Sequence, residues 1–426
     1  MKSQLFPTAL NQDLPHRSSL RLRLAGRVIN LFLRDAELTI FCRSPYTHIT
    51  VGRAGTEYFA MEIDNPDTLW DIIRNPDPVL GEAFMDGKWV LRRGDLGRFM
   101  TVLARNAQRL IDSRFGGIFS RFLQTVPPDT VHDARSSRKN ASFHYDLGND
   151  LYELFLDEGM NYSCAFWPSR DIDLRQAQLN KIHAIIGRLG VAPGMRVLEI
   201  GCGWGETASI MAREAGAASV TGITLADRQL AVAKTRANTP GLGNRLHFEL
   251  QDYREHAKTH LGAYDRIYSI GMFEHVGADS YGNYFAAIRS QLAPGGKALV
   301  HSIISGREKG RNGKMSSQWL ERYIFPGGEI CDLQTMLNAA KAEGLTPVAE
   351  PYVEPSYYYA ETLRHWRSNF TRNMDRLDPQ KYDERFRRMW LFYLAMCEAM
   401  FEGCGFTIAQ VVFKPFGPAK IARFDH

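Results

Sequence analysis

Five short apolar runs between residues 196 and 303 constrain the fold of this chain more than any other feature of its sequence. None of them alternates strictly between polar and apolar residues, and helical or loop sequence separates each run from the next. Such runs are typical of strands that are buried on both faces of a mostly parallel sheet, with helices on either side. We therefore predict an α/β domain with strands at 196–200, 219–224, 246–252, 264–271 and 296–303, closed by a late strand at 406–414.

The N-terminal part of the chain has a different pattern. Alternating runs at 37–42 and 58–63 predict strands, and residues 67–75 predict a helix. We interpret residues 1–125 as a small α+β domain. The stretch at 126–142 is rich in proline, serine and charge, and it predicts a linker.

The α/β domain then occupies residues 143–426. Its segment at about 304–395 is aromatic, Arg-rich and helical in pieces, so we expect it to form a helical lid over the sheet. A chain of 426 residues, 44% of them hydrophobic, has enough apolar material for two such cores.

The composition limits the expected cellular location of the protein and the partners that it can bind. No stretch reaches the ~18 uninterrupted apolar residues of a membrane span, and the N-terminus has no secretory core, so we expect a cytoplasmic protein. The six cysteines form no CxxC pair, which suggests reduced thiols and neither a disulfide framework nor a metal site. The net charge of +5 comes from residues 1–140, with 20 Lys and Arg against 15 Asp and Glu. Such an excess suits anionic lipid or nucleic acid, or is an ordinary solvated surface.

A glycine-rich turn follows the first strand of the α/β domain, in "VLEIGCGWG" (197–205). Gly201, Gly203 and Gly205 allow a tight turn and let a ligand approach bare backbone at the carboxyl edge of the sheet. Glu199 lies just before the turn, where a carboxylate can meet a cationic or hydroxyl-rich ligand. Alternatively, the glycines serve only the turn.

Two nucleotide cofactors compete for this turn. A dinucleotide site requires G-x-G-x-x-G and an acidic residue at the end of the next strand, where this chain has Thr224. S-adenosylmethionine has no pyrophosphate, and its sulfonium and amino groups suit Glu199. The turn therefore favours S-adenosylmethionine over NAD.

Longer motifs make the chain resemble one family from about residue 30 to its end. On them it resembles the cyclopropane-fatty-acyl-phospholipid synthases, a family similar to mycolic acid cyclopropane synthase. The resemblance implies a class I S-adenosylmethionine-dependent methyltransferase (Rossmann-like) domain that adds a methylene group to cis double bonds of lipid acyl chains. The motifs are "GEAFMDGKW" (81–89), "HYDLGNDLYELFLD" (144–157), "NYSCAFW" (161–167), "VLEIGCGWG", "GITL" with Gln229, "QDYR" (251–254), "SIGMFEHVG" (269–277), "YIFPGGE" (323–329), "YYAETLRHW" (358–366) and "ERFRRMWLFYLAMCEAMF" (384–401).

The resemblance also implies which residues contact the cofactor. Gln229 and Thr224 would hold the ribose hydroxyls in place of the missing acidic residue. The implied contacts, with Glu199 added from the reasoning above, are Tyr162, Ser163, Glu199, Gly201, Cys202, Gly203, Trp204, Gly205, Thr224, Leu225, Gln229, Asp252 and Tyr253.

In this family a bicarbonate ion serves as the catalytic base. By the same matching, the side chains of Glu274, His301 and Tyr359 and backbone groups at Cys164 and Ile303 would hold it. A base must remove a proton beside a lipid carbocation without trapping the cation, and caged bicarbonate meets both demands. Glu274 can accept the bicarbonate hydroxyl proton while histidine and tyrosine donate.

Several of these residues also have a structural interpretation. Glu274 is alternatively a turn cap, and His301 is alternatively a core histidine. We expect His275 to point to the other side of a continuing strand, with a structural role. Cys397 matches a position sometimes assigned as a nucleophile, but its apolar helical context favours a packed thiol beside the site.

The resulting hypothesis is a cyclopropane-fatty-acyl-phospholipid synthase. Its expected partners are unsaturated phospholipid in the bilayer, reached by peripheral contact at the inner face of the membrane, and a second copy in a homodimer. Nucleic acid is not expected. Basic amphipathic stretches at 17–34 and 104–124 suit a membrane interface. Alternatives are a methyltransferase that makes methyl-branched lipid or methylates a small molecule, and a lipid-binding protein without catalysis.

Overall fold

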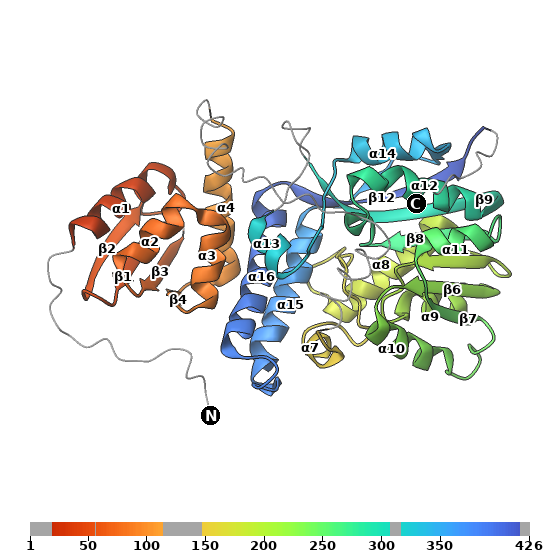
Figure 1. Cartoon of the computed structure of the whole chain (residues 1–426), viewed down its shortest axis with the longest axis horizontal. Helices are drawn as coiled ribbons and strands as arrows, with labels where there is room; N and C mark the ends of the chain where they lie inside the picture. The colour runs from red at the N-terminus through yellow and green to blue at the C-terminus, as the bar shows by residue number, and fades with distance from the viewer. Residues whose placement is uncertain (1–18, 56, 114–146, 307–316, 418–426) are drawn as a thin grey trace. The chain divides into compact units, whose positions relative to one another are not determined.

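The structure is a computed structural model that describes residues 19–55, 57–113, 147–306 and 317–417. The chain divides into two compact units (Figure 1). The first unit comprises Met1–Pro127, Ser317–Trp319 and Asp375–Cys404, and the second comprises Pro128–Ser316, Leu320–Met374 and Gly405–His426. The predicted linker at 126–142 lies outside the described residues.

The first unit contains a small sheet with the strand order β2-β1-β3-β4. The predicted strands at 37–42 and 58–63 are confirmed as β1 (Glu37–Cys42) and β3 (Tyr58–Ile63), which pair in parallel. The prediction missed β2 (Thr47–Gly52) and β4 (Trp89–Arg93), which pair antiparallel to β1 and β3.

Five helices accompany this sheet in the described part of the first unit. The predicted helix at 67–75 is α2 (Pro66–Arg74), which begins where the Asn65 side chain accepts hydrogen bonds from Asp67 N and Thr68 N. The other four are α1 (Leu20–Phe32), α3 (Pro76–Met85), α4 (Leu96–Ile111) and α16 (Glu384–Gly403).

The position of α16 differs from the predicted domain at 143–426 and the predicted lid at 304–395, which placed this segment with the α/β domain. In the structure α16 belongs to the first unit, because its apolar side chains pack against α3 and α4. The Phe392 ring lies 5.7 Å from the Phe84 ring and 4.9 Å from the Trp319 ring. A local apolar pattern predicts a buried helix without showing which core buries it.

The second unit is built on a sheet with the strand order β10-β12-β9-β8-β5-β6-β7. Strands β5 to β9 are parallel, and β12 runs antiparallel to β9. The predicted strands are confirmed with adjusted ends as β5 (Arg196–Ile200), β6 (Ser219–Thr224), β7 (Leu246–Leu250), β8 (Tyr264–Ile270), β9 (Leu292–Ser305) and β12 (Phe406–Pro415). Two short strands, β10 (Leu345–Pro347) and β11 (Tyr352–Val353), pair with β12.

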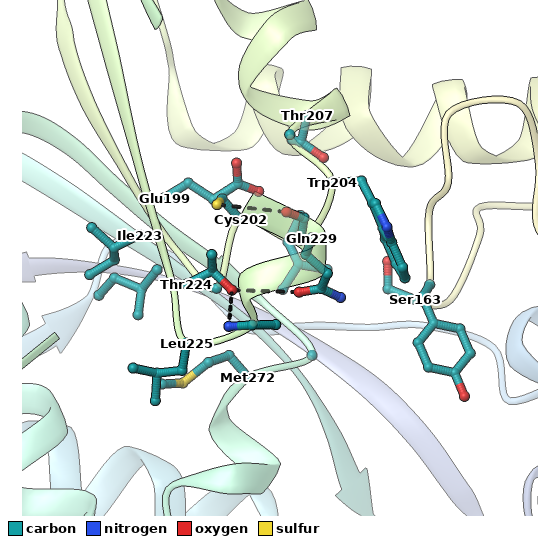
Figure 2. A pocket seen from close by; sticks show the side chains of 18 of the residues that line it. Ser163, Glu199, Cys202, Trp204, Thr207, Ile223, Thr224, Leu225, Gln229 and Met272 are labelled. Atoms are coloured by element: carbon teal, nitrogen blue, oxygen red, sulfur yellow. Dashed lines mark hydrogen bonds between the residues drawn. The ribbon is translucent and has the colours of Figure 1, made fainter. Parts of the chain in front are cut away.

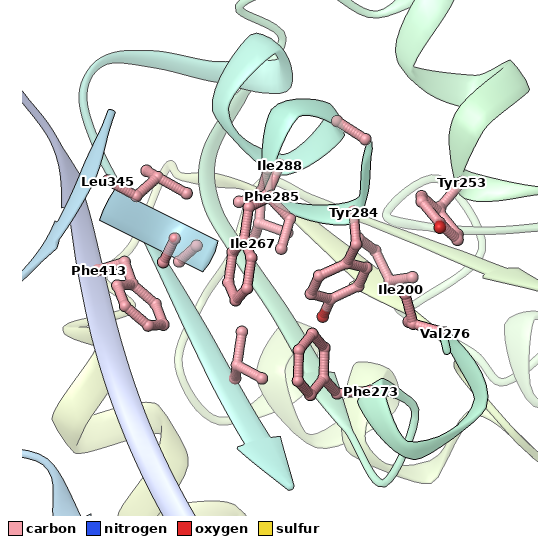
Figure 3. Close-up of a cluster of buried hydrophobic side chains, with 14 of the residues drawn as sticks. Ile200, Tyr253, Ile267, Phe273, Val276, Tyr284, Phe285, Ile288, Leu345 and Phe413 are labelled. Atoms are coloured by element: carbon pink, nitrogen blue, oxygen red, sulfur yellow. The ribbon is translucent and has the colours of Figure 1, made fainter. Parts of the chain in front are cut away.

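Both faces of this sheet are buried, as the apolar runs predicted. Neighbouring residues of one strand belong to different cores: Leu198 and Ile267 pack in the cluster of Figure 3, whereas Val197 and Tyr268 pack in a second cluster. Residues on both faces of the central strands therefore contact apolar neighbours, which explains the missing polar alternation there, whereas His247 and Glu249 of the edge strand β7 are exposed.

Helices cover the two faces of the sheet and its carboxyl edge. They are α7 (Asn149–Glu153), α8 (Leu174–Leu189), α9 (Glu206–Arg213), α10 (Asp227–Ala237), α11 (Tyr253–Thr259), α12 (Tyr281–Gln291), α14 (Leu333–Ala342) and α15 (Tyr357–Asn373), with α13 (Gln318–Tyr323) spanning the boundary between units. Within the described residues, no helix has the length and apolar character needed to span a bilayer.

Candidate active site

A cavity opens at the carboxyl ends of β5, β6 and β8 in the second unit (Figure 2). This is the edge where open α/β sheets bind ligands. We call it the cofactor cavity, because its lining contains every residue predicted to contact the cofactor. The lining residues are Met160–Ser163, Lys181, Glu199–Thr207, Ile223–Ala226, Gln229, Gln251–Tyr253, Ile270–Met272, His275, Val276 and Pro326.

The glycine turn forms as the sequence predicted. Gly203 has a φ of +52°, a left-handed conformation that L side chains rarely adopt, and a Cβ built there would meet nothing within 4 Å. A Cβ at Gly205 would approach Phe248 within 2.8 Å. Gly203 therefore leaves open space at the cavity wall, whereas Gly205 allows close packing against β7.

Glu199 is a buried carboxylate on the cavity wall. Its side chain is 3% exposed, and Oε2 has no hydrogen-bond partner among the described residues. Burial raises the pKa of Glu199 to about 8, and the nearby Lys181 ammonium partly opposes that rise. The unpartnered Oε2 of this buried carboxyl group fits a cationic ligand group, such as the amino or sulfonium group of S-adenosylmethionine, whose charge would favour the ionised form.

Polar side chains after β6 and β7 complete the cavity. Thr224 Oγ1 lies 3.5 Å from Gln229 Oε1 and accepts a hydrogen bond from Ala226 N at 3.2 Å (Figure 2). The Asp252 carboxylate caps α11 through Arg254 N and forms an ion pair with the Arg254 guanidinium at 2.8 Å. These groups lie where a nucleoside's hydroxyls could be bound, and their role as cofactor contacts stays a prediction.

Two of the predicted bicarbonate residues, Glu274 and His301, lie in and after neighbouring strands of the sheet. Glu274 lies in a 3-10 turn (Phe273–His275) after β8, and His301 lies in β9, paired with Ile270. The His301 carbonyl accepts a hydrogen bond from Gly271 N at 2.9 Å, which ties His301 to the wall of the cofactor cavity. The cofactor cavity and the predicted base site are therefore adjacent.

Glu274 and His301 retain buried polar atoms with no partner among the described residues. These atoms are Oε2 of Glu274 and both ring nitrogens of His301. Burial raises the pKa of Glu274 above its usual value, and burial lowers the pKa of His301 to about 3, so the imidazole is neutral near pH 7. Buried polar atoms without a hydrogen-bond partner can bind a small molecule or ion that forms hydrogen bonds with them.

Two details differ from the sequence predictions, and a third prediction stays untested. The Ile303 backbone N–H donates to Glu274 Oε1 at 2.6 Å, so it orients the carboxylate and is not directed at an anion. His275 does not continue a strand, because β8 ends at Ile270; it lines the cofactor cavity. Tyr359 lies on α15, with its ring 6.0 Å from that of Trp366, and no described contact tests its role.

Cys397 belongs to a different unit of the chain from these groups. It belongs to α16 in the first unit and does not line the cofactor cavity. Burial raises the pKa of its thiol to about 12, which disfavours the reactive thiolate. Burial thus favours the packed thiol, and the role of Cys397 in the reaction stays a prediction.

Sequence reasoning missed a buried polar group behind His301. Glu354, 3% exposed, has Oε1 4.0 Å from His301 Nε2 and accepts hydrogen bonds from Gln410 Nε2 at 2.7 Å and from the Cys164 thiol at 3.4 Å. Burial raises the pKa of Glu354 to about 7. No local sequence signal identifies Glu354, because its contacts, His301, Gln410 and Cys164, come from separate parts of the chain.

Comparisons with known proteins show which family the chain resembles. Residues 132–411 match the mycolic acid cyclopropane synthetase family. The chain is 33% identical over 404 residues to tuberculostearic acid methyltransferase UfaA1 of Mycobacterium tuberculosis, covering 92% of each chain. It is 34% identical over 363 residues to cyclopropane-fatty-acyl-phospholipid synthase of Escherichia coli, covering 83% of this chain and 87% of that one.

A solved structure of a related protein also superposes on the chain. The structure of mycolic acid cyclopropane synthase CmaA1 complexed with SAH and CTAB has a TM-score of 0.59 and 28% identity. The superposition covers 67% of this chain and 99% of that one.

Proposed function

The chain belongs to the mycolic acid cyclopropane synthetase family, and from that premise we propose that it is a cyclopropane-fatty-acyl-phospholipid synthase. Membership makes it an S-adenosylmethionine-dependent methyltransferase of the cyclopropane synthase family. The finer proposal is that it adds a methylene group to the cis double bond of unsaturated phospholipid acyl chains, with bound bicarbonate as the base.

The observation that carries the proposal is the pair of adjacent sites. One is a glycine-lined cavity with the unsatisfied Glu199 carboxylate, and the other contains the unsatisfied atoms of Glu274 and His301. The hydrogen bond from Gly271 N to the His301 carbonyl joins them. With the two sites adjacent, a base could remove a proton from the newly transferred methyl group, whose C–H electron pair then closes the ring onto the cationic carbon of the acyl chain.

The chain's residues then have separate roles. Bound S-adenosylmethionine supplies the methyl group, and bound bicarbonate supplies the base. Glu274 Oε2 would hold the anion as a hydrogen-bond acceptor, and the neutral His301 imidazole would hold it as a donor. Both residues are buried, with 9% and 1% of their surfaces exposed, and a buried site limits the water that would trap a cation on the acyl chain.

One helix supports the proposed contact with a membrane. The outer face of α1, defined as Leu20, Arg23, Leu24, Arg27 and Leu31, is exposed, with Leu20 and Leu31 at 64% and 72%. Positions spaced by three or four residues share one helix face. Leucines mixed with arginines on such a face suit an anionic bilayer, where arginine meets headgroups and leucine enters the interface.

The location and assembly that we propose are the cytoplasmic face of the membrane and a homodimer. Light scattering of the purified chain measures the oligomeric state, and a monomer would contradict the proposed homodimer.

Mass spectrometry of lipids from cells that express the chain tests the function. We expect unsaturated phospholipid chains to gain one CH2 and to resist mild hydrogenation, since a ring has no double bond. Cells that express the Gly203→Val variant provide the control. Unchanged lipids with a folded and abundant protein would instead indicate the lipid-binding protein without catalysis.

A second candidate is a methyltransferase that makes methyl-branched lipid. It is favoured by the relative that matches 92% of this chain, whose name is that of a methyltransferase. A saturated branch adds two hydrogens beyond the CH2 and requires a reductant. The same spectra therefore distinguish the two products by mass.

A further inference from the structure

The cofactor cavity contains a buried cation that the proposed mechanism does not use. Lys181 lies in α8, its side chain is 1% exposed, and it is the only lysine or arginine among the described residues that line the cavity. Burying an ammonium group is costly unless it interacts with polar partners, and an apolar side chain would fill the same space more cheaply. Its presence calls for a functional explanation.

The contacts of Lys181 lead to one residue of the cavity wall. Its ammonium Nζ donates a hydrogen bond to Ser163 Oγ at 2.8 Å. One turn earlier on α8, Gln178 Nε2 donates to the Ser163 carbonyl oxygen at 2.9 Å. Two side chains of α8 therefore fix both the backbone and the hydroxyl of Ser163.

This hydrogen bond determines what the Ser163 hydroxyl can do. An ammonium group only donates, so the serine oxygen must accept, and the serine proton is left to donate elsewhere. Ser163 lines the cavity, so an acceptor on a bound ligand can receive that proton. The nearby ammonium also polarises the hydroxyl and strengthens it as a donor.

The electrostatic surroundings agree with this arrangement. Burial lowers the pKa of Lys181 to about 8, and the carboxylates of Asp157, Glu199 and Glu354 oppose that effect. In turn, Lys181 lowers the pKa values of Glu199 and Glu354 against the dominant effect of burial. The cavity wall thus holds an acidic group and a basic group that moderate each other's charge.

We propose that Lys181 is a positioning residue that directs the Ser163 hydroxyl toward the carboxylate of the amino-acid part of S-adenosylmethionine. That part of the cofactor carries both an ammonium and a carboxylate. Glu199 matches the first, and the Lys181–Ser163 pair matches the second. The inference rests on the proposed cofactor assignment and extends it to a residue outside the family motifs quoted above.

Calorimetry with two ligands of the full-length protein tests the proposal. S-adenosylhomocysteine retains the amino-acid part, whereas methylthioadenosine keeps the nucleoside and lacks that part. We expect Lys181→Met to weaken S-adenosylhomocysteine binding by ~10-fold to 100-fold, the range for hydrogen bonds to charged groups. Its affinity for methylthioadenosine should stay within about twofold of the wild type. Lys234→Met, at an exposed lysine of α10, is the matched control and should change neither affinity.

A double-mutant cycle tests whether Lys181 acts through Ser163. Ser163→Ala should show the same ligand selectivity, and the Lys181→Met/Ser163→Ala variant should lose no more affinity than the larger single change. Fully additive losses would contradict action through Ser163. Equal weakening of both ligands would mean that Lys181 only maintains the cavity.

Two further outcomes are also decisive. If Lys181→Met does not fold, Ser163→Ala alone decides, because selective loss of S-adenosylhomocysteine supports the proposal and equal loss of both ligands overturns it. A folded wild type that binds neither ligand would refute the cofactor assignment itself, which separates that failure from a failure of the Lys181 proposal.

Discussion

Replacing Glu274 with glutamine separates a role in catalysis from a role in folding. Glu274 Oε1 accepts the Ile303 N–H at 2.6 Å, and Oε2 is buried with no partner among the described residues. Glutamine can keep its oxygen at the Ile303 N–H and place its NH2 group where Oε2 lies. The local structure is retained, while the acceptor that we assign to bicarbonate becomes a donor.

The expected loss of turnover is large. Removing a general base or misplacing it typically costs ~10²–10⁴ in rate. At about 1.36 kcal/mol for each factor of ten, this corresponds to about 2.7–5.4 kcal/mol of transition-state stabilisation. If Glu274 were only a turn cap, the change would cost ~1 kcal/mol of folding stability and little turnover.

The Glu274→Gln variant should lose turnover but gain folding stability relative to the wild type as pH rises. Burial raises the pKa of Glu274 above its usual value of 4.5, so the folded state favours the protonated carboxyl group. The wild type therefore loses stability as pH rises from the unfolded pKa through the folded pKa. Glutamine does not ionise, so the variant should become more stable than the wild type as pH rises through that window.

The assay measures turnover on vesicles of unsaturated phospholipid with S-adenosylmethionine. Wild-type turnover should fall in carbonate-depleted buffer and return when bicarbonate is added, whereas the Glu274→Gln variant should stay slow in both. Calorimetric affinity for S-adenosylhomocysteine should be nearly unchanged, since Glu274 does not line the cofactor cavity. Near-wild-type turnover in the variant, or a wild type indifferent to carbonate, would refute the assignment.

Three further predictions concern the cofactor turn, the membrane and Cys397. Gly203→Val places a β-branched residue at a φ of +52° on the cavity wall, so S-adenosylhomocysteine binding should disappear from a folded protein; unchanged affinity would exclude the turn as the cofactor site. Replacing Arg23 and Arg27 with Ala should reduce co-sedimentation with anionic vesicles, as added salt should, while Arg53→Ala should have no effect; binding insensitive to salt and to both arginines would mean an ordinary surface. Cys397→Ser should retain most activity, and a covalent adduct trapped on Cys397 would restore the nucleophile.

The fold of the second unit could be predicted because its strands are buried on both faces. Residues such as Val197 and Leu198 pack in different cores, so the central strands appear in the sequence as mainly apolar runs without strict alternation. The sequence analysis missed β2, whose only aliphatic residues are Ile49 and Val51, and β4, whose apolar run ends after Leu91. The packing of α16 on α3 and α4 depends on contacts between distant segments, which no local pattern contains.

The cofactor cavity could be predicted for a similar reason. Its residues lie in loops that directly follow strands, so short contiguous motifs contain them. Lys181 and Glu354 were missed because each is a single buried polar residue in an otherwise unremarkable segment. Their partners, Ser163, Cys164 and Gln410, are distant in sequence, and only the folded chain brings them together.

The most direct test of cyclopropane formation uses S-adenosylmethionine with a fully deuterated methyl group. The purified protein is incubated with this donor and with vesicles of unsaturated phospholipid, and the acyl chains are analysed by mass spectrometry. If the base removes one deuteron from the transferred methyl group as the ring closes, the product gains CD2 and contains no double bond. A product that retains all three deuterium atoms, or a chain that gains nothing while the protein binds the donor, would contradict the proposed function.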